Sequence, residues 1–455
     1  MANSYLSRTQ TAGTRTKATF SAWVKRSKLG ANQAIFGIYG AASDAGQIEI
    51  RFQSSGEGFH ISGQATNWRR TNRAFRDASG WYHLVVAFDT TQSTADDRVK
   101  VYVNGVQETS FAASGNPSQN ADLPFGLNGA TCVVGCNYNA GSAGDYFEGY
   151  MSHVALVDGA ALTPTSFGET DSTSGIWKFK QPSGVTWGTN GFHLKFENSG
   201  NLGLDSSGQT NNLTTNGNLK QAQDSPSNSY ATINPLLVPT SNLPTFSNAN
   251  TTSESSSNGT SKWGGCTTLG MTTGKWYCEA KATVNASYSR NVIGITGDSA
   301  NIARSNGSIL NGTHSWGWYS ENGSISGNGS ANIQTGTTYG TGDIVMVALD
   351  LDNNKLYFGK NGSWVYSGVP TSGSTGTGAI SIIAASTTND QAYFFGQNDD
   401  TGTTATSKFD WNFGNGFFGT TAITSAGSNG NGSLFEYDVP NGYYALNTKN
   451  INTYG

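Results

Sequence analysis

Charge, cysteine and long hydrophobic runs are all scarce in this chain of 455 residues. Only 12% of its residues are charged, and the net charge of −4 comes without a Lys/Arg cluster long enough to neutralise a row of phosphates. Nucleic acid is therefore not an expected partner. No stretch approaches the roughly 20 apolar residues that cross a membrane, and the N-terminus lacks the apolar core of a secretion signal. We expect neither membrane insertion nor Sec-dependent export.

Four cysteines are too few at this length to suggest a disulfide-built scaffold. On an extended strand, Cys132 and Cys136 would lie about 13 Å apart, beyond bridging distance, which predicts buried thiols. Cys266 and Cys278 could meet across neighbouring strands, so their disulfide state stays open. No histidine stands beside them at the spacing of a zinc ligand.

Helical periodicity is also missing, since no window of a dozen residues places apolar side chains at helical spacing. What is present is 59 glycines, abundant Ser, Thr and Asn, and 36% hydrophobic residues including 11% aromatics. That is enough packing material for globular cores joined by polar loops. The length exceeds what one core normally serves, so we predict an all-β chain of two domains.

One pattern occurs twice. Residues 84–89 lead to residues 101–105, and residues 345–350 lead to residues 356–362. In each case an apolar run ends in Asp, a polar excursion follows, and a second strand-like run closes on Asn-Gly, which favours a hairpin turn with positive φ. We predict two diverged copies of one β-architecture.

Short strand candidates bounded by turn residues continue through both halves of the chain. Parallel sheets would need crossover helices, and the sequence shows no helical periodicity. The pattern therefore favours antiparallel sandwiches. In the first half, alternation places Phe20, Ala22 and Val24 on one face of a strand, and Thr163 with Pro164 predicts a short helical turn. The candidates are residues 18–25, 33–39, 47–52, 59–62, 81–88, 98–103, 131–134, 147–157 and 191–196, then 275–284, 291–296, 315–319, 343–351, 355–360, 379–385, 392–396 and 408–413. Loops are expected over residues 198–218.

Four motifs follow one another in the first half: Thr19-Phe-Ser-Ala-Trp-Val-Lys25, Gly80-Trp-Tyr-His-Leu-Val-Val-Ala-Phe-Asp89, Val101-Tyr-Val-Asn-Gly105 and Phe147-Glu-Gly-Tyr-Met-Ser-His-Val-Ala155. Together they resemble the laminin-G-like, concanavalin-A-like lectin modules. The second half carries Gly274-Lys-Trp-Tyr-Cys-Glu279, Ile293-Gly-Ile295, Trp316-Gly-Trp-Tyr319, residues 342–358 and Lys360-Asn-Gly362. These motifs are similar to those of SPRY domains.

Both resemblances imply antiparallel β-sandwiches, so the expected fold is two concanavalin-A-like jelly-roll domains in tandem. We expect a laminin-G-like domain over residues 1–220, a proline-containing connector over 221–245, a SPRY-like domain over 246–437 and a C-terminal tail over 438–455. Four prolines between residues 226 and 244 suit an extended connector, with the boundary near residue 235. The tail has enough aromatic residues to dock.

Residues 224–236 resemble the connector between such modules in structural proteins of marine tailed bacteriophages. The resemblance implies a non-enzymatic virion protein, either a tail or head fibre or a capsid decoration, assembled in the host cytoplasm and displayed on the particle surface. Its partners would be other virion proteins, copies of itself (trimers in a fibre) and a host-surface glycan held by loops. A carbohydrate-active enzyme of the same fold and an architectural cement protein without a ligand stay open as alternatives.

Glycoside hydrolysis needs two carboxylates that flank the scissile bond. The strand at residues 47–52 supplies Glu49 alone. Asp350 with Asp352 falls at a predicted turn, and Glu436 with Asp438 is interpreted as a solvated strand face. We assign no catalytic residue.

The five histidines are scattered over different segments, and no nucleophile elbow or phosphate loop accompanies them. His83 and His153 alternate with apolar neighbours and are interpreted as partly exposed strand residues. The set is His60, His83, His153, His193 and His314.

No cofactor is predicted, although calcium stays an alternative because loop carboxylates suit it. The acidic loop candidates are Asp96, Asp97, Asp145, Asp399 and Asp400. Sugar binding would use exposed aromatic rings, but core packing is favoured for each candidate, so the ligand-binding residues are left open. The aromatic candidates are Trp68, Trp316, Trp318 and Tyr319.

Overall fold

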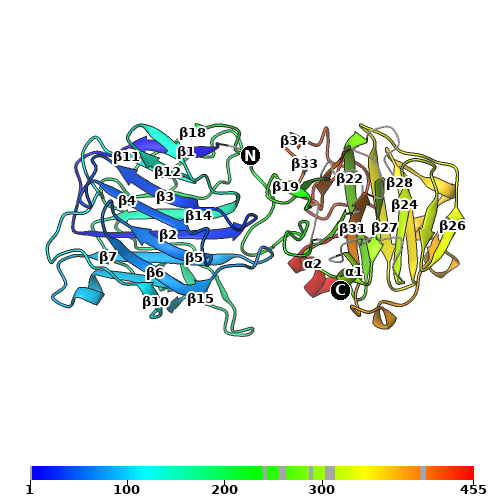
Figure 1. Cartoon of the computed structure of the whole chain (residues 1–455), viewed down its shortest axis with the longest axis horizontal. Coiled ribbons are helices and arrows are strands. Elements are labelled where there is room, and N and C mark those ends of the chain that lie inside the picture. The colour runs from blue at the N-terminus through cyan, green and yellow to red at the C-terminus, as the bar shows by residue number, and fades with distance from the viewer. Residues whose placement is uncertain (1–2, 239–242, 256–262, 286–290, 303–312, 400–405) are drawn as a thin grey trace. The chain divides into compact units, whose positions relative to one another are not determined.

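The computed structural model describes residues 3–238, 243–255, 263–285, 291–302, 313–399 and 406–455. The chain divides into two compact units, Met1–Gln221 (unit 1) and Ala222–Gly455 (unit 2). Strands dominate both units (Figure 1), which confirms the all-β prediction. Among the described residues, no helix is both long enough and apolar enough to span a membrane.

Unit 1 packs a large antiparallel sheet against a small one. The large sheet runs in the order β10 (Phe111–Ala113), β6 (Asn67–Ala74), β5 (Gly58–Ser62), β4 (Gln47–Phe52), β3 (Gln33–Tyr39), β11 (Thr131–Val134), β1 (Tyr5–Thr9) and β18 (Thr214–Asn216). The small sheet runs in the order β17 (Phe192–Leu194), β14 (Gly149–Asp158), β2 (Lys17–Arg26), β7 (Tyr82–Asp89), β8 (Val99–Val103) and β9 (Val106–Gln107).

The core of unit 1 lies between these two sheets. Phe20, Ala22 and Val24 of β2 point inward, where they share one buried cluster with Ile48 and Ile50 of β4. Because successive side chains of a strand point to opposite faces, this alternation commits one face of each strand to the core. Burying such a side chain contributes about 1.5–3 kcal/mol. The prediction for residues 18–25 is confirmed.

Both outer faces of unit 1 are partly covered by additional segments. The hairpin of β12 (Asn137–Asn139) and β13 (Ser142–Gly144) follows β11 and lies against β3. Residues 160–190, which we name the outer strap, cover the outer face of the small sheet. The strap contains the 3₁₀ turn η2 (Pro164–Ser166) and the hairpin of β15 (Gly168–Thr170) with β16 (Trp177–Phe179), and η1 (Ala95–Arg98) precedes β8.

The helical turn predicted at Thr163 and Pro164 exists as η2, with Pro164 at its start. Thr163 occupies the N-cap position, but its side chain makes no capping hydrogen bond. Its hydroxyl instead lies 2.8 Å from the hydroxyl of Thr165.

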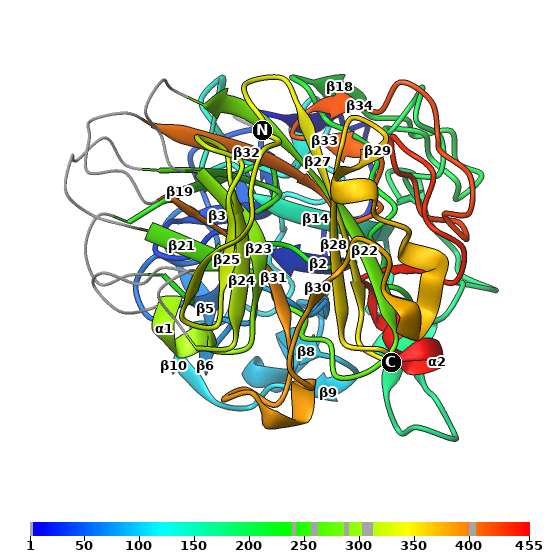
Figure 2. The same cartoon turned by 90° about the vertical axis from the view of Figure 1, so that its right-hand side faces the viewer.

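Unit 2 is also a sandwich, and Figure 2 shows its layers, with β22, β27 and β28 in one and β23, β24, β25 and β31 in the other. The first layer runs in the order β19 (Thr245–Ser247), β20 (Thr252–Glu254), β32 (Ser407–Asn412), β22 (Lys275–Asn285), β27 (Ile344–Asp350), β28 (Lys355–Lys360) and β29 (Ser363–Trp364), with β30 (Ile380–Ser381) on β28 and β35 (Tyr444–Ala445) on β22. The second runs in the order β21 (Trp263–Cys266), β31 (Phe394–Asp399), β23 (Asn291–Thr296), β24 (Ser315–Tyr319), β25 (Ile325–Gly327) and β26 (Ser330–Gln334). Other elements are α1 (Ser299–Ile302), α2 (Thr448–Tyr454), η3 (Val365–Ser367), η4 (Pro370–Thr375), η5 (Ala385–Thr387), β33 (Phe417–Phe418) and β34 (Thr421–Ala422).

The described part of residues 221–245, expected as an extended connector, belongs largely to unit 2. Ala231 and Ile233 are buried in its core cluster. The backbone N–H of Ala231 donates to Leu446 O, and that of Ile233 donates to Asn250 O, each at 2.9 Å. Burial of these apolar side chains therefore draws the segment into the second sandwich. The unit boundary falls after Gln221 instead of near residue 235.

The C-terminal tail docks on unit 2. β35 pairs in parallel with β22, and Val439, Tyr443 and Leu446 are buried. α2 begins after Asn447, whose side chain accepts a hydrogen bond from the backbone N–H of Asn450 and so caps the helix.

The two Asn-Gly turns adopt the positive φ values that the repeated pattern predicts. Asn104 and Gly105 have φ of 49° and 81°, and Asn361 and Gly362 have φ of 50° and 85°. Asn104 Oδ1 accepts the backbone N–H of His83, and Asn361 Oδ1 accepts that of Ile344, each at 2.8 Å. The two units therefore use the same device: an Asn-Gly turn joins β8 to β9 and β28 to β29, and its Asn side chain bonds back to β7 and β27.

Candidate functional site

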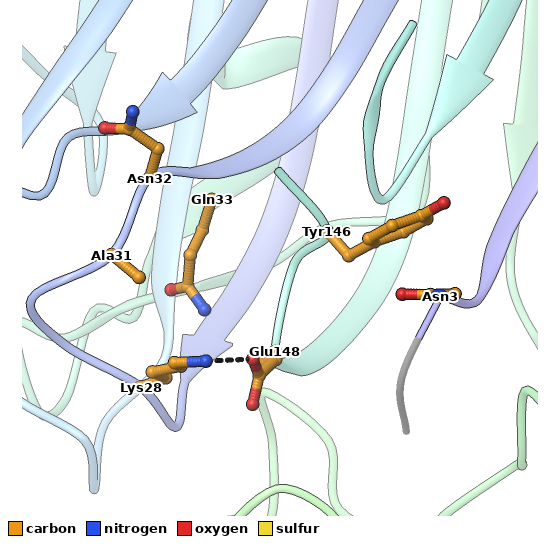
Figure 3. A pocket seen from close by; sticks show the side chains of 7 residues that line it. All are labelled: Asn3, Lys28, Ala31, Asn32, Gln33, Tyr146 and Glu148. Carbon is orange, nitrogen blue, oxygen red and sulfur yellow. Dashed lines mark hydrogen bonds and ion pairs between the residues drawn. The ribbon is translucent and has the colours of Figure 1, made fainter. Parts of the chain in front are cut away.

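A small pocket opens at the end of the unit 1 sandwich where β2 leaves the small sheet and β3 enters the large one. Its volume is about 190 Å³, which suits one small ring rather than a long ligand. Figure 3 shows Lys28 and Glu148 meeting across the pocket, with the amide of Gln33 directed toward them and the ring of Tyr146 beside Asn3. We name this the rim pocket; its lining residues are Asn3, Lys28, Ala31, Asn32, Gln33, Tyr146 and Glu148.

The loop that forms one wall of the rim pocket is braced from below by a buried ion pair. Arg26 and Glu57 lie 2.8 Å apart and are almost completely buried. Glu57 also accepts the backbone N–H of Gly30 at 2.6 Å, and Asn32 accepts the backbone N–H of Ser54 at 3.0 Å. These bonds hold the loop in place before any ligand arrives.

The opposite wall is the segment that leads into β14. The hydroxyl of Tyr146 donates to Ala143 O at 3.2 Å, and its ring lies 6.1 Å from that of Tyr5. Glu148 pairs with Lys28 at 2.5 Å, and both side chains remain partly exposed. The pocket thus combines an aromatic ring, amides and a neutralised ion pair, the kinds of group that hold hydroxyl-rich ligands.

Beside the rim pocket, the outer face of the large sheet carries a polar patch formed by Glu49, Arg51, His60 and Asp145. Arg51 Nη1 lies 2.9 Å from Glu49 Oε2 and 3.5 Å from Asp145 Oδ2. His60 lies directly opposite Arg51 on the neighbouring strand. Asp145 precedes Tyr146, so the patch and the rim pocket share one chain segment.

Burial shifts the titration of the patch. It raises the pKa of Glu49, and it lowers the pKa of His60 to about 4, helped by the charge of Arg51. Three buried polar atoms of the patch have no hydrogen-bond partner among the residues that the structure describes: Glu49 Oε1, Arg51 Nε and His60 Nδ1. Buried polar atoms are normally paired, so these atoms call for water or a ligand group.

Three of the residues named in the sequence analysis, Glu49, His60 and Asp145, lie together in this patch. Lys28 and Tyr146 were not considered, because loops distant in sequence carry no periodic pattern to mark them.

The other acid pairs have structural roles. Asp350 accepts from Asn353 and pairs with Lys275 at 2.9 Å, which confirms the turn role. Asp352 accepts the backbone N–H of Gly274. The interpretation of Glu436 and Asp438 as a strand face is wrong. They lie in a loop, where their carboxylates accept the backbone N–H groups of Thr424 and Ser428.

The interpretation of His83 as partly exposed is also wrong. His83 is completely buried, because Trp177 of the outer strap covers it. His153 is half-buried, with φ of 47° at a β-bulge in β14. His193 is buried nearby, and His314 is half-buried in unit 2.

Core packing is confirmed for three of the aromatic candidates. Trp68, Trp316 and Trp318 are buried, and Tyr319 is half-buried. The cysteines are free and buried, so Cys266 and Cys278 form no disulfide.

The acidic loop residues considered as calcium ligands do not form a common site among the described residues. Asp96 faces Arg69, Asp97 pairs with Lys100, and Asp399 is buried beside Ser407. Asp400 lies outside the described residues. Within the described residues, no three His, Cys, Asp or Glu side chains come together as a metal site would require.

The concanavalin A-like lectin/glucanases superfamily model matches residues 2–166, and the SPRY domain model matches residues 275–398. Unit 1 therefore contains a laminin-G-like domain, and unit 2 contains a SPRY domain. The rim pocket and the polar patch lie within the laminin-G-like domain. No curated protein sequence matches the chain.

Solved structures show distant likenesses to one domain or the other. The SPRY domain of human HERC1 is 14% identical, with 39% of this chain and 96% of that one covered and a TM-score of 0.30. The heptameric SAP-like pentraxin of Limulus polyphemus is 20% identical, with 35% and 71% covered and a TM-score of 0.27. Domain 4 of AbnA, an extracellular arabinanase of Geobacillus stearothermophilus, in complex with arabinotriose, is 22% identical, with 33% and 65% covered and a TM-score of 0.24.

Proposed function

We propose that the protein is a non-enzymatic glycan-binding protein whose laminin-G-like domain holds a neutral sugar in the rim pocket. The observation that carries the proposal is the composition of that pocket in a lectin/glucanase fold. Tyr146 offers a ring, Gln33 and Asn32 bring amides, and Lys28 with Glu148 supplies both a donor and an acceptor.

The charge balance of the pocket favours a neutral sugar over an acidic one. Lys28 is neutralised by Glu148 at 2.5 Å. A sugar hydroxyl can accept from the ammonium and donate to the carboxylate, so it fits between two such groups without bringing a charge. Amide side chains provide the same pairing.

A glycan array with the full chain, followed by calorimetric titration of the strongest neutral oligosaccharide, tests the proposal. Lys28→Ala should weaken binding by about tenfold, because one charge-assisted hydrogen bond contributes roughly 1.5 kcal/mol. Lys100→Ala is the matched control. Lys100 forms an ion pair of similar exposure with Asp97, toward the opposite end of the small sheet. Equal affinities of the two variants would contradict the proposal.

Hydrolysis is the rival function, and the geometry of Glu49 weighs against it. Glu49 and Asp145 share the guanidinium of Arg51, so two carboxylates do lie close together. However, the free oxygen of Glu49 is enclosed by protein, and a general acid must reach the glycosidic oxygen of its substrate. Release of reducing sugar from a panel of polysaccharides that is abolished by Glu49→Gln would favour the enzyme.

We extend the proposal to a structural protein of a bacteriophage particle, present in many copies at the virion surface as a tail or head fibre or a capsid decoration. The resemblance of residues 224–236 to the connector in such proteins supports this extension. Weak sugar sites gain avidity when many copies act together, so we expect a homo-oligomer bound to other virion proteins.

Imaging of intact particles by cryo-electron microscopy, with mass spectrometry of their proteins, tests this extension. Two sandwich densities at a repeated surface position are expected. Absence of the chain from purified particles would contradict the extension without affecting the sugar site. A cement protein without a ligand would be present on particles but fail on the glycan array.

A further inference from the structure

The outer strap of unit 1 covers a second apolar surface, outside the sandwich core. It lies over Val85, Ala155 and Val157 on the outer face of the small sheet, and it adds Phe167 and Trp187 to that cluster. Most of the strap follows residue 166, where the match to the lectin/glucanase model ends. The strap lies on the small sheet, away from the rim pocket, so its attachment is a separate question from the sugar site.

The middle of the strap is attached through His83. Trp177 on β16 donates its indole N–H to His83 Nδ1 at 2.9 Å, and the two rings are nearly parallel. An indole nitrogen can only donate, so His83 Nδ1 must carry a lone pair and the proton must be on Nε2. Nε2 lies 2.9 Å from Ser21 Oγ, which accepts its hydrogen bond. This contact requires a neutral His83.

A second attachment involves a pair of histidines. His153 Nδ1 and His193 Nε2 lie 3.4 Å apart, so one nitrogen must donate and the other must accept. Phe179 of the strap stacks on His153 with ring centroids 3.5 Å apart, and Trp187 stacks on His193 at 5.8 Å. Two protonated rings would bring two N–H groups and two positive charges together.

The charged neighbours of the histidine pair act in opposite directions. Lys195 disfavours protonation of both His153 and His193. Asp205, which accepts the backbone N–H of His193 at 2.9 Å, favours protonation of that residue. Burial is the larger effect, and it lowers the pKa of His153 to about 3 and that of His193 to about 4.

Around His83 the neighbouring rings are uncharged. Trp23 stacks on His83, with ring centroids 4.7 Å apart. Burial first, and then His153, lowers the pKa of His83 to about 3. The strap hairpin has charges of its own, but Lys178 pairs with Asp171 and Glu169 at the exposed surface.

We propose that the outer strap is an acid-released cover. Protonation of His83, His153 and His193 removes the acceptor for Trp177 and breaks the histidine pair, so the β15–β16 hairpin leaves the small sheet. The ends of the strap are held by bonds that do not involve an imidazole, including Leu162 N–H to Thr19 Oγ1 at 2.8 Å. Release therefore exposes His83 and the stacked face of His153, while the ends of the strap keep the apolar cluster covered and the sandwich core stays folded.

The direction and size of the effect follow from linkage. When the strap opens, each histidine returns to its ordinary pKa of about 6.5. The closed strap is therefore fully stable above that pH, and it loses stability as the pH falls toward the lowered pKa values of the closed state. Each histidine multiplies the opening equilibrium by up to about tenfold per pH unit in this window. His153 and His193 stay neighbours on β14 and β17 after release, so we count one proton for this pair. Together with His83 the effect is up to about a hundredfold per unit.

Hydrogen–deuterium exchange of the full chain between pH 7.5 and 5.0, corrected for intrinsic exchange rates, tests the proposal. Peptides from residues 168–180 should lose protection steeply below about pH 6.5. Peptides from β2 and β7 should stay protected. Constant protection of the strap, or loss of protection only together with β2 and β7, would overturn the proposal.

Variants distinguish protonation of the histidines from a loss of side-chain packing as the cause of strap opening. His83→Gln cannot be protonated, so it should reduce the pH dependence of strap opening by about tenfold per unit. His60→Gln, on the large sheet, should leave it unchanged. Trp177→Phe keeps a ring but loses the N–H donor, so it should open the strap more at pH 7.5 and retain a pH dependence. If His83→Gln fails to fold, the wild-type exchange profile still decides.

Discussion

Arg51 lies directly opposite His60 on β4 and β5, and its positive charge helps burial to hold the pKa of His60 at about 4. The same guanidinium pairs with Glu49 and Asp145. A single guanidinium thus interacts with both carboxylates and with the imidazole of the polar patch. It also links the outer face of the large sheet to the segment that forms one wall of the rim pocket.

Arg51→Ala should destabilise unit 1 by about 2 kcal/mol, because it leaves the buried carboxylate of Glu49 without its partner. Urea unfolding measures this change. Lys100→Ala, which breaks the exposed Lys100–Asp97 pair, should change the free energy of unfolding by no more than about 0.5 kcal/mol. Equal effects of Arg51→Ala and Lys100→Ala would contradict the role given to Arg51.

Glu279 should make the stability of unit 2 fall as pH rises from about 4.5 to 7. Burial raises its folded pKa to about 7, so the folded state keeps a proton that the unfolded state has released. The loss over this window is about 3 kcal/mol, at about 1.4 kcal/mol per unit. Stability from this group is complete below the unfolded pKa and lost above the folded one.

Glu279→Gln provides the control for that prediction. The carboxylate accepts the backbone N–H groups of Glu436 and Tyr437, the hydroxyl of Tyr277 and the amide of Asn412. A glutamine amide, like the protonated carboxyl, turns a donor toward these donors, so the variant should resemble the protonated wild type at low pH and lack the pH slope. Parallel pH profiles of the wild type and the variant in urea unfolding would contradict the assignment.

Asn361→Ala should cost unit 2 about 1–2 kcal/mol. It places a Cβ-bearing residue without a side-chain bond at φ of 50°, and it removes the acceptor for Ile344 N–H. Asn361→Gly keeps the backbone conformation accessible and should cost less. Thermal unfolding compares the two variants. Equal stability of the alanine and glycine variants would contradict the claim that the positive φ at residue 361 strains an alanine.

The four thiols should not react with an aromatic disulfide reagent at neutral pH until the chain unfolds. They are buried, and burial raises the pKa of Cys132 and Cys136 to about 12. In denaturant without reductant, all four should react. A count of two would indicate a disulfide that the structure lacks.

Much of the strand pattern could be predicted from sequence because alternation and turn residues act locally. The predicted strands at residues 33–39, 47–52, 291–296 and 355–360 match β3, β4, β23 and β28 residue for residue. The polar strand β6 was missed, because its stabilisation comes from long-range contacts such as Arg69 with Asn116. The candidate at residues 379–385 is mostly not strand, since only β30 pairs there.

The site was less predictable, because distant loops assemble it. Alternation places Phe20, Ala22 and Val24 toward the core and so leaves Ser21 and Trp23 on the opposite face of β2, but no local signal shows that these two residues are also buried. Glu49 and Asp145 were noted separately, as a lone acid and a calcium candidate. Their shared partner Arg51 becomes visible only when β4 and the segment before β14 are brought together.

Calorimetric titration of Tyr146→Ala with the neutral oligosaccharide selected on the array tests the central claim most directly. Loss of the ring from the rim pocket should raise Kd by about fivefold or more, since such an aromatic contact contributes about 1 kcal/mol or more. Tyr146→Phe keeps the ring and should bind nearly as the wild type does. An unchanged Kd for Tyr146→Ala would contradict the account.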